Sequence, residues 1–566
     1  MTKHIEPVWR RQGQGVQILI MAAVFLGSFG LRRSALPAQN TTITGSIRSA
    51  SDEPVSGALV KVRSAELRLG FMVVSQEQGR YSTPNLPPGK YSIQAFGGDF
   101  ESDSAGPVVI RNGEQRKMDL VLNTLRKKTP PAEDPIYHRG MTNASYEKLM
   151  PEGEGKRLII SRCTICHSLE RVVSKRATRE VWQKIVDRMH DYLQDHRVPL
   201  TDQERDAMLD YVAKNFSSAV APFRHERGPV PDSNSNLPRT LLTGTAAKFV
   251  AMEYYLPRGV WIHHMAVDSH GTAWFSETSA GILGRFDPAS LTYTPIAPPA
   301  GKFPERFINA VAVDPQDRVW LTDNEPNGLL YQYNPTSKQF TTYEIPAPPG
   351  SRPNVNTLRF RDGSVWGTAI SFSQIVTLDP KTRKWIQFPV SKGSLPYGLA
   401  FGGDNMLWYS AGYDNDVVKL DPSTGMMTHY KAPTPKSGLQ QLQADTEGNL
   451  WVAESESGKL LKVDYRTGKL AEYEPPTKDS GPFGIDVDMK RELIWFGEMN
   501  AGKLGRYDPR GNSFVEFPLP SLPSEDSGVE FSDEKVIWIE VDPSHPNRVW
   551  WGAGTNARIG YIEVLE

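Results

Sequence analysis

Gly271-Thr272-Ala273-Trp274-Phe275-Ser276-Glu277 is the first copy of a motif that is repeated through the second half of this 566-residue chain. Its tryptophan recurs at positions 274, 320, 366, 408, 451, 495 and 550, with five intervals of 42 to 46 residues and a last one of 55. Each tryptophan follows a polar turn, and several of the strands after it end near Asp-Pro, as at Asp287-Pro288. A period in the forties with four short strands per unit is typical of a β-propeller.

The two ends of this repeat region predict how it closes. The segment 252–257 has the pattern of an outer strand, yet it precedes the first tryptophan. The last copy ends at 558–562 without an outer strand of its own. We expect the two segments to pair, because pairing protects an edge that would otherwise be exposed. The sequence therefore predicts a seven-bladed propeller over residues 245–566.

The only two cysteines of the chain lie in Cys163-Thr164-Ile165-Cys166-His167. C-x-x-C-H is the attachment pattern of c-type haem, in which both thiols bond the haem and the histidine binds the iron. The alternatives are a redox C-x-x-C, a disulfide and half a zinc site. No βαβ pattern surrounds the motif, and no second cysteine pair completes a zinc site. We expect one covalent haem c on Cys163, Cys166 and His167.

Helix signals flank the haem motif within residues 145–217. A short helix is expected before the motif, a second from Arg179 to about Tyr192, and a third from Thr201, where Glu204 completes a capping box. The segment resembles small monohaem class I cytochromes c. That resemblance implies a compact all-α haem domain that transfers electrons.

For the second axial ligand of the iron we favour Met189. Methionine with histidine is the usual pairing in cytochromes c, and Met189 lies seven residues beyond Trp182, on the same helix face. Met208, His190 and His196 stay open as alternatives, although Met208 has the pattern of a core residue.

Residues 40–123 consist of short alternating runs separated by glycine and proline turns, which indicates an all-β sandwich. The segments at 54–62 and 86–91 resemble the carboxypeptidase regulatory-like domain. That resemblance implies a structural or adhesive role, sometimes attributed to carbohydrate binding, without catalytic residues. Linkers are expected at 124–144 and 218–244, the second one rich in proline, serine and asparagine.

The N-terminus has the layout of a secretory signal. Arg10 and Arg11 precede an apolar run at 16–31, and a small-residue segment ends at Ala38. We expect a signal peptide over residues 1–38, with an uncleaved anchor as the alternative. Haem attachment to C-x-x-C-H takes place on the outer side of the inner membrane, so we expect a periplasmic or secreted protein.

The charge composition limits the kinds of partner that the chain is expected to bind. Lys+Arg 64 against Asp+Glu 65 leaves no net field to attract nucleic acid or an anionic membrane. No other apolar segment has the length of a membrane span. We therefore expect a periplasmic redox partner and a small-molecule or glycan ligand, and neither nucleic-acid binding nor a membrane span in the mature chain.

The repeat region resembles the virginiamycin B lyase-like, or streptogramin lyase, family. The motifs are Trp274-Phe275-Ser276-Glu277 with Leu283-Gly284-Arg285, and a second copy at 495–498 with 504–506. The resemblance implies catalytic histidines at P-H-x-I strand starts in the last two blades, a glutamate after the last tryptophan, and magnesium.

This chain departs from that catalytic pattern. The histidine position of blade six is Phe483, the blade-seven strand 536–540 offers no histidine, and the glutamate position aligns with Thr555. The tyrosine position of blade one aligns near His263. We therefore do not carry the lyase reaction over, and we interpret Glu277, Glu454 and Glu498 as residues of blade structure.

The sequence as a whole predicts an exported monohaem c-type cytochrome that transfers electrons, with the propeller as a platform for a substrate or partner. The alternative is a propeller enzyme, either a streptogramin lyase-like C–O lyase or an oxidoreductase that delivers electrons to the haem. His263-His264 is the one local concentration of histidines in the propeller, with either a metal or substrate role or a structural one.

Overall fold

The computed structural model describes residues 41–126, 147, 150–163, 170–173, 176–195, 200–219, 237–257, 262–303, 306–324, 327–347, 353–499, 501–520, 536–553 and 558–566. The predicted signal peptide, Cys166, His167, His196 and Thr555 lie outside the described residues. The described chain is mostly β, with a helical segment between an N-terminal β domain and the repeat region.

The N-terminal β domain contains ten strands in two sheets around a buried core. One sheet has the order β4-β1-β8 with β9 beside β1, and the other contains β10, β6, β5, β2 and β3, with β7 beside β5. Alternate residues such as Ile43, Ile47, Val60 and Val62 fill the core between them. The strands are β1 (Thr42–Ser49), β2 (Leu59–Ser64), β3 (Leu69–Val74), β4 (Arg80–Ser82), β5 (Gly89–Gly97), β6 (Phe100–Glu101), β7 (Ala105–Ile110), β8 (Gln115–Lys117), β9 (Leu120–Leu122) and β10 (Thr124–Leu125).

The repeat region forms six four-stranded antiparallel sheets, each built from four consecutive strands. This is the arrangement that the tryptophan period predicts. The sheets are β12 (Ile262–Val267), β13 (Ala273–Glu277), β14 (Ile282–Asp287) and β15 (Thr292–Ile296); β16 (Ile308–Val313), β17 (Val319–Asp323), β18 (Leu329–Asn334) and β19 (Gln339–Glu344); β20 (Val355–Arg361), β21 (Ser364–Ala369), β22 (Gln374–Asp379) and β23 (Lys384–Pro389); β24 (Pro396–Phe401), β25 (Leu407–Ala411), β26 (Asp416–Leu420) and β27 (Met427–Lys431); β28 (Leu439–Ala444), β29 (Leu450–Glu454), β30 (Lys459–Val463) and β31 (Leu470–Tyr473); β32 (Pro482–Asp488), β33 (Leu493–Glu498), β34 (Lys503–Asp508) and β35 (Ser513–Pro518).

A further set of four strands joins the two ends of the repeat region. β36 (Val536–Val541), β37 (Arg548–Ala553) and β38 (Arg558–Val564) are followed across the sheet by β11 (Phe249–Tyr255). β11 pairs antiparallel with β38, from Phe249 opposite Val564 to Tyr255 opposite Arg558. The expected pairing of the first outer strand with the last copy is confirmed.

The innermost strands lie side by side in a closed cycle. β12 contacts β16, and the cycle continues through β20, β24, β28, β32 and β36 back to β12. The recurring tryptophans are buried between the sheets. In several copies the indole is held by an aspartate before the turn, as where Trp274 Nε1 donates to Asp268 Oδ2 at 2.9 Å and Trp320 Nε1 to Asp314 Oδ2 at 2.8 Å. The arrangement is that of a β-propeller.

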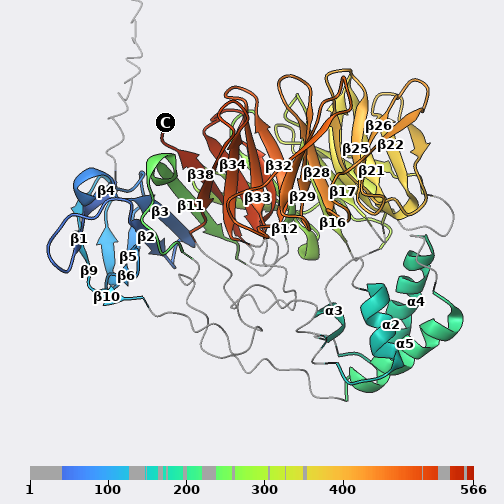
Figure 1. Cartoon of the computed structure of the whole chain (residues 1–566), viewed down its shortest axis with the longest axis horizontal. Helices are drawn as coiled ribbons and strands as arrows, with labels where there is room; N and C mark the ends of the chain where they lie inside the picture. The colour runs from blue at the N-terminus through green and yellow to red at the C-terminus, as the bar shows by residue number, and fades with distance from the viewer. Residues whose placement is uncertain are drawn as a thin grey trace, which may run out of the picture. The chain divides into compact units, whose positions relative to one another are not determined.

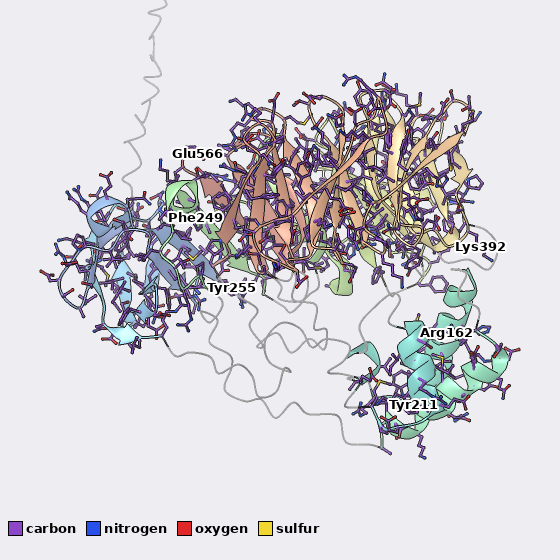
Figure 2. All side chains as sticks on the ribbon, in the orientation of Figure 1. Arg162, Tyr211, Phe249, Tyr255, Lys392 and Glu566 are labelled. Carbon is purple, nitrogen blue, oxygen red and sulfur yellow. The ribbon has the colours of Figure 1, made fainter. Side chains whose placement is uncertain are left out.

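The sequence did not predict that β11 pairs on its other side with β3 of the N-terminal domain. Met252 lies opposite Phe71, and Glu253 lies opposite Gly70, so that the two regions share a ten-stranded sheet. β3 and β11 are adjacent in Figure 1, and Figure 2 labels Phe249 and Tyr255 at the two ends of β11. All six residues of β3 are buried, which explains why this strand needs a partner on each edge.

The helical segment contains α2 (Glu154–Cys163), α3 (Glu170–Val173), α4 (Arg179–Asp195) and α5 (Asp202–Asn215). Thr201 caps α5 in the predicted capping box with Glu204. The segment has a core of its own, to which Trp182, Met208 and Val212 belong.

Candidate functional site

The haem motif begins at the end of α2. Cys163 is the last residue of this helix, and the next six residues of the chain are outside the described part. The thiol of Cys166 and the imidazole of His167 therefore have no described position. The structure fixes the helix that leads into the motif, and haem ligation by Cys163, Cys166 and His167 stays a prediction.

Close packing against α5 fixes the position of α2. A Cβ on Gly155 would lie 2.2 Å from Tyr211 Cβ, so only glycine permits the approach of the two helices at this point. Tyr211 Oη donates to Pro151 O at 2.6 Å, and burial raises the pKa of this tyrosine to about 12. Arg162 of α2 forms an ion pair with Glu204 of α5 at 3.2 Å (Figure 2 labels Arg162 and Tyr211).

Met189 lies on α4 and is half-buried. Trp182 and Val186 of the same helix are buried in the helical core, where Trp182 Nε1 donates to Phe216 O at 2.9 Å. Met189 therefore lies outside the set of fully packed side chains, and its role as an iron ligand stays a prediction.

The alternative ligands differ from Met189 in their surroundings. Met208 is 2% exposed and belongs to the core, which agrees with the interpretation of its sequence pattern. His190 Nε2 lies 3.0 Å from Leu200 O and 4.0 Å from Asp202. The donor set of two thiols, an imidazole and a thioether fits a covalent haem c.

In the repeat region, a hydroxyl two residues after the tryptophan shapes the start of the innermost strand. Ser276 Oγ accepts from the backbone N–H groups of His263 and His264, at 3.2 and 3.0 Å. A β-bulge lies at this point, between Ile262 and Met265, and brings the two histidines together. Similar hydroxyl contacts and bulges occur at Thr322, Thr368 and Ser410.

The two histidines form a buried pair. Their Nδ1 atoms are 2.7 Å apart, and the His264 ring lies 3.9 Å from the Trp538 ring between centroids. Burial, then the neighbouring His263 and Arg359, hold the pKa of His264 well below its ordinary value. His264 is therefore neutral near pH 7. Among the described residues no group of three or more His, Cys, Asp and Glu side chains has the arrangement of a metal site.

A second set of residues occupies one register position of the innermost strands, opposite the tryptophan of each sheet. We call these residues the inner ring. Its members are Ala266, Ala312, Arg359, Ala400, Gln443, Asp486 and Glu540. No motif of the sequence pointed to Arg359, Asp486 or Glu540 as candidate functional residues. The signal that finds them is their register with the tryptophans, about eight residues upstream in each copy.

Burial perturbs the charged members of the inner ring. Burial and then the charge of Asp486 raise the pKa of Glu540 to about 8, against the opposing effect of Arg359. Burial also raises the pKa of Asp486 and lowers that of Arg359.

The positions of the lyase catalytic residues have other surroundings here. The Phe483 ring meets the Tyr397 ring edge to face at a centroid distance of 5.8 Å. Glu277, Glu454 and Glu498 end the second strands of their sheets and are fully buried. Burial raises the pKa of Glu454 to about 7 and that of Glu498 to about 8, which suits carboxyl groups inside a sheet structure.

The described helices include none that is both long and apolar enough to cross a membrane.

Two family models match parts of the chain. The virginiamycin B lyase family matches residues 383–547, and the carboxypeptidase regulatory-like domain matches residues 42–123. No curated protein matches the sequence as a relative.

Solved structures of virginiamycin B and streptogramin B lyases are similar to slightly more than half of this chain. Virginiamycin B lyase from Staphylococcus aureus is 21% identical, with a TM-score of 0.48, over 56% of this chain and 100% of that chain. A catalytically inactive histidine-to-alanine variant of that enzyme with quinupristin is 22% identical, with a TM-score of 0.48, over the same shares. A streptogramin B lyase is 21% identical, with a TM-score of 0.49, over 57% of this chain and 100% of that one. The chain thus contains a virginiamycin B lyase-like domain and a carboxypeptidase regulatory-like domain.

Proposed function

We propose that the protein is an exported monohaem c-type cytochrome that transfers electrons to or from a periplasmic redox partner. The observation that carries the proposal is Cys163-Thr164-Ile165-Cys166-His167, which contains every cysteine of the chain. Cys163 and Cys166 would hold the haem covalently, and His167 and Met189 would be its axial ligands. A bound haem c supplies reversible one-electron chemistry at iron.

The helical segment supports this proposal. Its helices have their own core, and α2, which ends at Cys163, packs closely on α5 at Gly155. Met189 is half-buried on the helix that places Trp182 and Val186 in the helical core. We therefore propose that residues 145–217 form a cytochrome c-like domain.

We further propose that the repeat region is a seven-bladed propeller that serves as the platform for a substrate or partner. The closed cycle of innermost strands and the closing pair β11–β38 support the count. The virginiamycin B lyase-like match favours a lyase as the second candidate. Against it stands Phe483, which occupies a histidine position of the family and packs on Tyr397.

The deciding experiment is a haem assay on the full chain, secreted from cells that mature c-type haem. We expect a haem-stained band on a denaturing gel and a c-type α band in the reduced spectrum. Cys166→Ala should lose the stain, because one thioether bond is removed and the attachment motif is broken. A colourless, folded protein would overturn the proposal, and cleavage of quinupristin by that protein would establish the lyase instead.

The second axial ligand has its own control. Met189→Ala should keep the haem stain, change the spin state of the iron and lower the reduction potential, since thioether ligation raises it. The matched control is Met426→Ala, because Met426 is 72% exposed. Unchanged spectra of the Met189 variant would exclude this residue as the ligand.

A further inference from the structure

The helical segment enters the chain between two strands of one sheet. β10 ends at Leu125, and the next described strand of that sheet is β11, which begins at Phe249 and pairs with β3. Because of this pairing the N-terminal β domain and the repeat region form one folded body, which we call the β body. The helical segment has a core of its own, separate from the two cores to which β3 and β11 contribute.

One arginine joins the two points at which the chain leaves and re-enters the β body. Arg126 follows β10 directly and is 5% exposed. Its Nη2 donates to Leu237 O at 3.0 Å, and its Nη1 donates to Pro238 O at 2.9 Å. Leu237 and Pro238 are the first described residues after the helical segment. A single guanidinium therefore holds together two points of the chain that are 111 positions apart.

The turn between β5 and β6 contacts both of these points; the two strands lie beside β10 in Figure 1. Arg126 N donates to Asp99 O at 2.8 Å, and Arg126 Nη1 also donates to Gly98 O at 3.2 Å. On the returning chain, Arg239 Nη1 forms an ion pair with Asp99 Oδ1 at 3.0 Å. Since both side chains of that ion pair are accessible to solvent, the buried Arg126 contributes most to the join.

The returning chain is packed onto the β body from its first described residue. Leu237 is 3% exposed and belongs to a core of the β body. Leu242 N donates to Gly57 O at 2.9 Å, and a Cβ on Gly57 would lie 2.2 Å from Leu242 O. Buried carbonyl groups need donors, and the fixed fork of a guanidinium can supply several of them at once. The chain is thus fixed on the β body well before β11 begins.

We propose that Arg126 clamps shut the base of an inserted domain, so that the β body stays closed whether or not the helical segment is folded. Bringing the ends of a long loop together costs conformational entropy. The contacts of Arg126 and the pairing of β3 with β11 offset that cost within the β body itself. In the electron transfer proposed above, a partner can then bind the inserted domain without opening the platform, although the clamp does not rest on the haem proposal.

The test is hydrogen exchange of the full chain, followed by mass spectrometry of peptides from 237–247, from β11 and from α4 and α5. Arg126→Met should speed exchange roughly tenfold or more in the peptide that contains the Leu242 amide, because the clamp contacts are lost. Exchange in α4 and α5 should not change. Arg126→Lys keeps the charge but not the fork of donors, so it should give a smaller increase in the same peptide.

A second variant opens the helical segment instead of its base. Trp182 is 2% exposed in the helical core, and its Nε1 donates to Phe216 O. Trp182→Ala should therefore speed exchange in α4 and α5 roughly tenfold or more. The peptides from 237–247 and from β11 should exchange as they do in the unchanged protein. Faster exchange in 237–247 would show that the base depends on the helical segment, and would overturn the proposal.

The matched control is Arg48→Met in the same β domain. The Arg48 side chain is 42% exposed, and its Nη1 donates to Asp52 O at 2.7 Å. This variant should leave exchange unchanged in all three sets of peptides. Unchanged exchange of the Leu242 peptide in a folded Arg126→Met protein would also overturn the proposal. The Trp182 variant tests the independence of the β body even if the Arg126 variants fail to fold.

Discussion

The outer strands of the repeat region differ sharply in their surroundings, although their sequences have similar patterns. β23 and β27 form the free edges of their sheets and are mostly exposed, with Ile386 at 58% exposure. β11 is the corresponding outer strand of the last copy, yet five of its seven residues are buried. β3 pairs with it on the side that is free in β23 and β27. The difference teaches that the closing strand of the propeller also holds the N-terminal domain.

A buried carboxyl group lies at the centre of this junction. Glu253 is 0% exposed and lies opposite Gly70 on one side and Gly560 on the other. Tyr255 Oη donates to Glu253 Oε1 at 2.6 Å. A Cβ on Gly70 would lie 2.7 Å from the same oxygen, so this glycine gives the carboxyl group its room.

The largest effect is expected from Met252→Ala on β11. Met252 is 0% exposed in the core that both regions share, so its truncation should cost about 2–5 kcal/mol in free energy of unfolding. Ile386→Ala on β23 is the control and should change the free energy of unfolding by less than about 0.5 kcal/mol. Equal effects in urea unfolding would contradict the contrast between the two edges.

Gly70→Val tests the room around Glu253. The added atoms would collide with the Glu253 carboxyl group, and overpacking of this kind costs roughly 1–3 kcal/mol. Thermal unfolding measures the loss. The double change Gly70→Val with Glu253→Ala should recover part of it, and a double variant no more stable than the single one would contradict the proposed clash.

Tyr255→Phe removes one hydrogen bond from the junction. Loss of a partner from a buried charged acceptor costs about 1–3 kcal/mol. The matched change is Tyr430→Phe on the exposed β27, with an expected effect of less than about 0.5 kcal/mol. Burial and then the charge of Glu253 raise the pKa of Tyr255 to about 12, so its absorbance should not titrate below pH 11.

A further effect is a slope in the dependence of stability on pH. Burial and then Glu516 raise the pKa of Glu498 to about 8, well above its ordinary value of 4.5. The folded state therefore binds the proton more tightly, and stability should fall as the pH rises from about 5 to 8. Glu498→Gln should reduce this slope, whereas the exposed Glu474→Gln should leave it unchanged.

Local patterns in the sequence were enough to predict the individual sheets and helices. The tryptophan period marked every sheet of the repeat region, because each tryptophan packs between neighbouring sheets and has to recur with them. The capping box at Thr201 and Glu204 located the start of α5 for a similarly local reason. The predicted end of the N-terminal β domain at residue 123 lies just before β10. This strand pairs with β6 and extends the domain to Leu125.

Contacts between distant segments left no comparable trace. The pairing of β3 with β11 joins residues about 180 positions apart, and the alternation of β11 is that of any outer strand. Arg359, Asp486 and Glu540 come from three strands and carry no shared motif, so only their common register opposite the tryptophans unites them.

The sequence by itself determined the order of the parts, the repeat, the C-x-x-C-H motif and the strand that closes the last sheet. These features depend on spacing and alternation along the chain, which a sequence displays directly. Only the tertiary structure decided that the N-terminal domain shares a sheet with the repeat region and that Asp486 accepts hydrogen bonds from Gln443 and Val541 of the two neighbouring innermost strands. Such features depend on which edges and side chains meet after folding, and that is set by burial and by the pairing of strand edges rather than by local sequence.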